Sequence, residues 1–195
     1  GAGRFTAILT KPAHLQALWN SVLLSIATVA AAATLGVPLA LLTRDVGAPG
    51  RWLGRLALAP LFLSPVLGTI SFGFLFGRGG VVPHLLPGIE WSFRGFEAAL
   101  LVHALTMFVY FFLFVSAGLV RLDWDLVLAA RSLGAAPLRV FRTVVMPLLK
   151  PALFAAAALT FMASMASFTA PYVFGGNERY LTTAMTERAV RFLKT

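Results

Sequence analysis

Ionisable side chains that could carry acid-base chemistry are scarce in the long apolar stretches of this chain. Four such stretches are present, at about residues 20–43, 56–77, 96–120 and 148–168. Charged side chains occur in them only near the ends, at Glu97 and Lys150. Proton relays and intramembrane acid-base catalysis therefore lack the groups that they need. No GxxxxGK[ST] loop is present either, so the sequence has no phosphate-binding motif for ATP hydrolysis.

His103 is the ionisable residue that lies well inside an apolar stretch, on a face shared with Met107, Tyr110 and Phe114. A histidine in this position is more often satisfied by a neighbouring helix or by interfacial water than used in function. The alternative is a role in a translocation pathway, for which His103 and Tyr110 are candidates. Pro65 is a third candidate, because the carbonyl that a proline frees must face protein or a water-lined path.

A metal site is not expected, because His14 and His84 are far from His103 in the sequence and no cluster has metal-ligand spacing. The chain has no cysteine, which excludes disulfides and thiol catalysis. Of its 195 residues, 59% are hydrophobic and only 12% are charged, with a mean hydropathy of +0.86. This leaves too little polar surface for a soluble domain and predicts a membrane protein.

Residues 121–147, here called the elbow, form a basic segment between the third and fourth apolar stretches. Its first half predicts a short amphipathic helix from apolar residues at i, i+3, i+4 and i+7, namely Leu126, Ala129, Ala130 and Leu133. Gly134 then stands where a helix end needs positive φ, and Pro137 suits the first turn of a new helix. The second half has an apolar stripe of Leu138, Phe141 and Val145. Pro147 and Pro151 mark the re-entry into apolar sequence.

The elbow resembles the EAA signature of permease subunits of binding-protein-dependent ABC importers. The resemblance lies in the spacing of Ala129-Ala130, Gly134, Val144, Met146 and Pro147. The stretches 20–42, 59–80 and 167–176 also resemble segments of that family, so the likeness covers nearly the whole chain.

In that family the signature is a cytoplasmic coupling helix that docks into a groove on the ATPase subunit. The resemblance implies that the ATPase-coupling residues are Leu128, Ala129, Ala130, Arg131, Gly134, Pro137, Leu138 and Pro147. Leu128 stands where the family has a Glu, so the polar contact of that Glu does not carry over.

We expect an all-α polytopic membrane helix bundle with the type I ABC importer permease fold, in one domain over residues 1–195. The spans are expected at the four apolar stretches, and an external loop with a surface helix at 169–195. The chain begins without Met, which suggests an incomplete permease unit. Two ridges of small residues, Thr28-Ala32-Gly36-Ala40 and Ala152-Ala156-Thr160-Ser164, predict faces buried against other helices.

Orientation follows from the distribution of basic residues between the spans. Residues 44–55, expected to form a loop, together with the elbow region 121–150 hold eight Lys and Arg residues, whereas 78–95 holds only Arg78 and Arg94. The positive-inside rule therefore places the elbow in the cytoplasm.

The resemblance implies the transmembrane subunit of an ATP-driven solute importer in the bacterial inner membrane. Its partners would be cytoplasmic ATPase subunits, a second permease subunit or fused half, and a periplasmic or lipid-anchored substrate-binding protein, with membrane lipid around the spans. The chain would bind no cofactor itself, because the ATPases bind ATP. Permeases for ferric iron, thiamine, sulfate, molybdate, polyamines or aminoethylphosphonate resemble the span set most, and the choice among these solutes stays open.

Two other classes of function fit the sequence less well. An ATP-independent channel or secondary transporter needs an ion-coupling site or a selectivity ring, which spans without internal charge do not supply. An intramembrane enzyme needs paired catalytic groups, which are absent from the spans. The net charge of +9 is spread between the spans rather than gathered in one patch, so nucleic acid is not expected as a partner.

Overall fold

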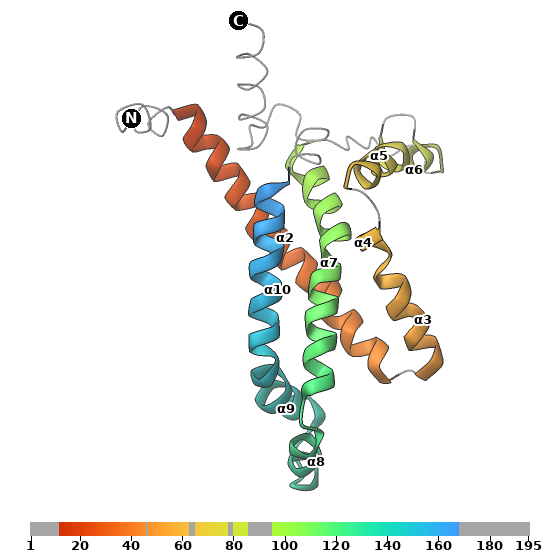
Figure 1. The fold of residues 1–195 in the computed structure, drawn as a ribbon, viewed down its shortest axis with the longest axis vertical. Coiled ribbons are helices and arrows are strands. Elements are labelled where there is room, and N and C mark those ends of the chain that lie inside the picture. The colour runs from red at the N-terminus through yellow and green to blue at the C-terminus, as the bar shows by residue number, and fades with distance from the viewer. Residues whose placement is uncertain (1–11, 46, 63–64, 78–79, 86–94, 168–195) are drawn as a thin grey trace, which may run out of the picture.

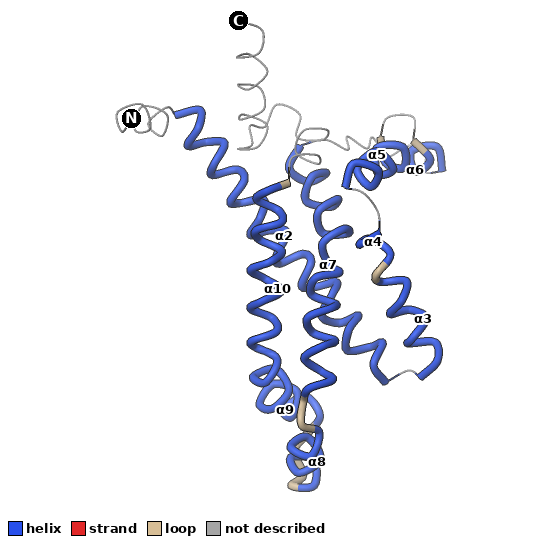
Figure 2. The backbone as a smooth tube through the Cα atoms, viewed as in Figure 1, coloured by secondary structure: helices blue, strands red, loops and turns tan. Residues whose placement is uncertain are grey.

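The computed structural model describes residues 12–45, 47–62, 65–77, 80–85 and 95–167, and this part of the chain is helical with no strand (Figure 2). The elements are α2 (Pro12–Asp45), α3 (Gly47–Ala57), α4 (Ala59–Phe62), α5 (Pro65–Phe76), α6 (Val81–Leu85), α7 (Gly95–Arg121), α8 (Trp124–Ser132), α9 (Pro137–Val140), the π-helical turn η1 (Phe141–Val145) and α10 (Met146–Ala166). The predicted all-α class is confirmed. The predicted external helix within 169–195 lies outside the described residues.

Three helical segments in the described ranges are long and apolar enough to cross a membrane: Leu15–Arg44, Gly95–Arg121 and Pro137–Ala166. They belong to α2, to α7 and to the run α9-η1-α10. These helices pack against one another, with α2 crossing both α7 and α10 obliquely (Figure 1). We call α2, α7 and α10, which make the most extensive contacts with one another, the three-helix unit.

The α2 contact face consists of the small residues that the sequence pattern predicted. Thr28, Ala32 and Ala40 are almost completely buried. At Gly36 even a methyl group would collide with α7, because an added Cβ would lie 2.6 Å from the Cβ of Phe111. In lipid, helices associate through such close backbone approach, since apolar side chains gain little by leaving an apolar solvent. The prediction of a packing ridge is confirmed.

The second ridge lies on α10 and is confirmed over most of its length. Ala156, Thr160 and Ser164 are buried, whereas Ala152 is only half-buried. Opposite Ala152, an added Cβ on Gly118 of α7 would lie 3.1 Å from the Ala152 Cβ and 2.9 Å from the Leu149 Cδ2. The absence of a side chain at Gly118 is therefore what brings α7 and α10 together near the elbow.

Residues 44–55 were expected to form a loop, and this is wrong: α2 continues to Asp45 and α3 begins at Gly47. Gly47 adopts φ +66°, which allows the chain to reverse direction within a very short connection. The helix α3 is amphipathic, with Arg51 exposed and Ala57 buried. The Gly and Pro residues that favoured a loop lie in its first turn, where they are tolerated.

The span expected at 56–77 is not one helix. Its residues are divided among the end of α3, α4 and α5, and the segments Pro49–Phe62 and Leu67–Leu85 are bent by 106° relative to each other. Pro60 lies within α4 and Pro65 is the first residue of α5, so the interruptions occur beside the two prolines. Taken as one broken span, this pair is the fourth candidate for crossing the membrane.

Candidate functional site: the elbow

The first helix of the elbow, α8, is attached at its N-terminus to α7 and to α2. Asp123 is the N-cap of α8, and its side chain accepts a hydrogen bond of 3.0 Å from the backbone N–H of Asp125. The indole Nε1 of Trp124 donates to the carbonyl of Leu119 on α7, at 3.2 Å. The guanidinium of Arg44, near the end of α2, lies 3.0 Å from the centre of the Trp124 ring. Trp124 therefore joins α8 to α2 and α7 at once.

The turn between α8 and α9 has the geometry that the sequence predicted. Gly134 has φ +80°, and its N–H donates to the carbonyl of Arg131 at 2.9 Å. The N–H of Ala135 donates to the carbonyl of Ala130 at 3.2 Å. These two bonds are the Schellman pattern, which satisfies the last carbonyls of a helix. Pro137 then begins α9, so both predictions about the turn are confirmed.

Pro147 and Pro151, expected to mark the re-entry into apolar sequence, lie within one helical run that continues from Pro137 to Ala166. Directly before Pro147 the run passes through the π-helical turn η1, where the N–H of Met146 bonds to the carbonyl of Phe141. A proline ring conflicts with the carbonyl four residues earlier, here that of Thr143. The wider π turn relieves this conflict, so the elbow and the span remain one piece.

The inner side of the elbow packs on the ends of the spans. Val127 of α8, Val140 of α9 and Val145 of η1 are buried in one cluster with Leu119, Leu122 and Leu149. The first predicted stripe does not form this face: Leu126, Ala129 and Leu133 are exposed, and Val127 between them is buried. The second stripe forms it in part, because Val145 is buried and Phe141 packs on the cluster, whereas Leu138 is exposed.

The outer side of the elbow therefore presents large apolar side chains to its surroundings. Leu126, Leu128, Leu133 and Leu138 are exposed, Leu133 at the turn to 88%. Arg131, Arg139 and Arg142 are exposed on the same segment. Exposed leucines gathered on one short polar segment indicate a surface for a protein partner.

The residues of the predicted coupling set lie together on the elbow. The exposed members are Leu128, Ala129, Arg131, Gly134, Pro137, Leu138 and Pro147. Ala130 is half-buried, because it also packs on the valine cluster. Val127, Val140 and Trp124 were missed from sequence, although a valine close to a leucine of each stripe was the available signal.

His103 is buried between α7 and α10. Its Nδ1 lies 3.1 Å from the Ser164 hydroxyl and its Nε2 lies 3.0 Å from the Ser167 hydroxyl. Ser25 of α2 donates to the same Ser164 oxygen at 3.1 Å. We call these four residues the polar node, and it joins all three membrane-length helices. The expectation that a neighbouring helix satisfies His103 is confirmed, whereas the roles of the serines were missed.

The other two pathway candidates lie elsewhere. Tyr110 is two turns further along α7 than His103 and is half-buried. Pro65 is the first residue of α5, a separate element that touches α7 where Gly68 meets Thr106. The assignment of His103, Tyr110 and Pro65 to a pathway stays a prediction. The described residues hold no group of His and acidic side chains that could bind a metal ion.

Three membrane-length helices and an elbow with an exposed apolar side define a multi-pass membrane protein. The chain belongs to the family of binding-protein-dependent transport system inner membrane components, which matches residues 19–193. This confirms the resemblance to ABC importer permeases and the inner-membrane location.

Relatives of known name support the same assignment. The probable ABC transporter permease protein y4fN of Sinorhizobium fredii is 31% identical over 87% of this chain and 31% of its own length. The molybdenum transport system permease protein ModB of Mycobacterium tuberculosis is 35% identical over 93% of this chain and 70% of its own. The sulfoquinovosyl glycerol transport system permease protein SmoG of Agrobacterium fabrum is 30% identical over 95% of this chain and 63% of its own length. The chain thus spans about a third to two thirds of the length of these relatives.

Proposed function

We propose that this chain forms part of the solute pathway of an ATP-driven importer and that the elbow is its contact with a cytoplasmic ATPase. The observation that carries the proposal is the two-sided character of the elbow. Its inner valines are packed on the spans, and its outer leucines are exposed. A segment of this kind can bind a partner without detaching from the spans.

The contacts of the elbow suggest how movement of the ATPase reaches the membrane. Trp124 holds α8 to α7 and α2. The second half of the elbow, α9 and η1, continues without a break into the membrane-length helix α10. A shift of the elbow should therefore move the three-helix unit as a body. This is the rigid-body type of transition by which a pathway can open alternately to either side.

The remaining members of the assembly are also part of the proposal. The chain has no ATP-binding loop of the GxxxxGK[ST] type, so the ATPase subunits would bind and hydrolyse ATP. The family is named for its dependence on a binding protein, which would deliver the solute to the outer side. A second permease subunit or fused half would complete the pathway. The relatives are named for different solutes, so the likeness supports import as a class rather than one solute.

The coupling role is tested by distorting the turn of the elbow. Gly134→Val should prevent association with the ATPase, because a β-branched residue is strained at φ +80°. Ala136→Val is the matched control, since Ala136 is also exposed but has φ −60° and ψ 147°. Co-purification of the ATPase with each variant, at equal amounts of membrane-inserted permease, is the measurement. Wild-type recovery of the ATPase with Gly134→Val would contradict the proposal.

The orientation of the elbow is tested separately by cysteine labelling, because the chain has no native cysteine. Ser132 on the elbow and Leu85 in α6 are both exposed. In intact cells a membrane-impermeant thiol reagent should label Leu85→Cys at once, and Ser132→Cys only after the membrane is permeabilised. The reverse pattern would place the elbow on the side without ATP and end the coupling proposal.

A further inference from the structure

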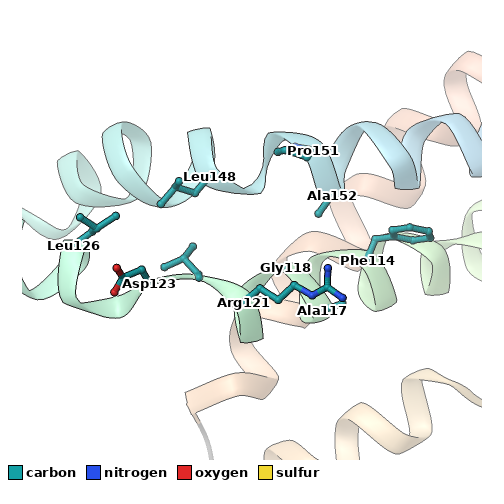
Figure 3. Close-up of a pocket in the computed structure, with 10 residues that line it drawn as sticks. Phe114, Ala117, Gly118, Arg121, Asp123, Leu126, Leu148, Pro151 and Ala152 are labelled. Carbon is teal, nitrogen blue, oxygen red and sulfur yellow. The ribbon is translucent and has the colours of Figure 1, made fainter.

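A groove of about 540 Å³ lies between the last turns of α7 and the first turns of α10, next to the elbow (Figure 3). Its walls are mainly apolar and consist of Phe114, Ala117, Gly118, Leu122, Leu126, Leu148, Pro151 and Ala152. Arg121 and Asp123 are its charged residues. The close contact at Gly118 joins the two helices here, and the small side chains on either side leave the space open.

The two charged side chains of the groove lie at opposite ends of it. Figure 3 shows the Arg121 side chain extended beside Gly118 and Ala117 toward Phe114, and Asp123 near Leu126. The Asp123 carboxylate is already engaged as the N-cap of α8. Arg121 has neither an ion pair nor a ring contact with any residue in the described ranges, whereas Arg44 and Arg55 each lie over a tryptophan ring. The positive charge of Arg121 is therefore left without a protein anion in this part of the chain.

The position of Arg121 relative to the membrane makes this charge significant. Arg121 is the last residue of α7, and side chains on a helix lean toward its N-terminus. Its guanidinium thus points back along an apolar, membrane-length helix rather than away from it. An unpaired charge is costly near hydrocarbon. The phosphate of a lipid is an anion that the membrane itself supplies at this depth.

We propose that this groove binds one anionic phospholipid. Arg121 contacts the phosphate, and the apolar wall from Phe114 to Pro151 accepts part of an acyl chain. The charge and lining of the groove fit an amphipathic ligand, because the guanidinium of Arg121 lies beside a mainly apolar wall. The site adjoins the proposed coupling surface at Leu126, whereas the exposed residues Leu128, Leu133 and Leu138 of the elbow do not line it.

The test is lipid binding to the purified permease, measured by native mass spectrometry with phosphatidylglycerol or phosphatidylcholine. The first phosphatidylglycerol should bind about fivefold more tightly than phosphatidylcholine, the effect of one basic residue at a membrane surface. Arg121→Gln should abolish this preference. Ala117→Phe should weaken binding of both lipids by filling the groove, without disturbing the core, because Ala117 is exposed. Arg142→Gln removes an exposed elbow charge outside the groove and should keep the preference.

Two results would overturn the proposal. The first is an undiminished preference for phosphatidylglycerol in Arg121→Gln. The second comes from a photo-reactive residue introduced at position 117 of the membrane-embedded transporter. Cross-linking to lipid supports the site, whereas cross-linking to a second permease subunit would show that protein covers the groove. Neither result depends on ATPase binding, so failure here leaves the coupling role of the elbow standing.

Discussion

Where α2 packs on the other spans its residues are small and buried, whereas on the outer side of the elbow the residues are large, apolar and exposed. Gly36 lets the backbones of α2 and α7 approach closely, and Ala32 and Thr28 are fully buried on the same helix. Leu128 and Leu133 touch little within the subunit. Both surfaces would count as apolar by composition, so composition alone does not reveal the different tasks.

The difference follows from the solvent around each region. In lipid, a leucine gains little by facing protein, so stable association between spans depends on close fit and hydrogen bonds. Beyond the spans an exposed leucine faces water and gains free energy when a partner covers it, up to about 1.5 to 3 kcal/mol per side chain. The outer leucines of the elbow are therefore free to contact a partner, whereas the small residues of the spans are already buried against other helices.

The largest effect is expected from breaking the close fit. Gly36→Leu should prevent folding of the three-helix unit, because its side chain would enter the space occupied by the backbone and Cβ of α7. Ala30→Leu, on an exposed face of the same helix, should be tolerated. Size-exclusion chromatography and thermal unfolding in detergent measure both. Normal folding of Gly36→Leu would mean that α2 and α7 do not touch as described.

Two adjacent residues sharpen the comparison within the elbow. Val127 is 7% exposed and Leu128 is 59% exposed. Val127→Asp should destabilise the fold by about 3 kcal/mol or more, because a charge would be buried without a partner. Leu128→Asp should leave the melting temperature nearly unchanged and weaken binding of the isolated ATPase, since it removes an apolar contact. Equal ATPase affinity of Leu128→Asp and wild type would show that Leu128 lies outside the contact.

A smaller effect is expected at the polar node. His103→Leu removes both ring hydrogen bonds to serines, and hydrogen bonds in membranes contribute about 0.6 kcal/mol each on average. The loss in stability should therefore be about 1 kcal/mol, and Ser167→Ala should cost roughly half of it. Thermal unfolding gives these values. If His103→Leu keeps its stability but abolishes solute import, His103 belongs to the pathway rather than to the packing.

Local backbone conformation and close helix packing could be predicted from the sequence where they depend on the type of a single residue. Gly134 at the positive-φ position, Pro137 at a helix start and the small residue at every fourth position of α2 are features of this kind. They were predicted correctly because each depends on backbone sterics or on helical repeat alone. The helical class of the described residues was expected from the length of the apolar stretches and from the family resemblance.

The rest depends on contacts between segments that are distant in the sequence. Which side of α8 is buried is decided by Leu122 and Leu149, and the leucine stripe carries no information about them. The hydrogen bond between Ser25 and Ser164 joins residues 139 positions apart. The helix at residues 47–57 formed despite its Gly and Pro residues because it packs against α2 and meets Phe112 of α7 at Gly54. No short-range pattern encodes these three results.

The π turn at Phe141–Val145 also sets the register between the elbow and the span. Five residues in an α-helix rotate by about 140° beyond a full turn, so Val140 and Val145 could not both face the core of an unbroken α-helix. The wider turn brings both onto the buried side. Deleting one residue there, such as Thr143, would restore regular winding and rotate α9 by about 100°. The exposed leucines of the elbow would then point in another direction, although the residues that form the contact surface would be the same.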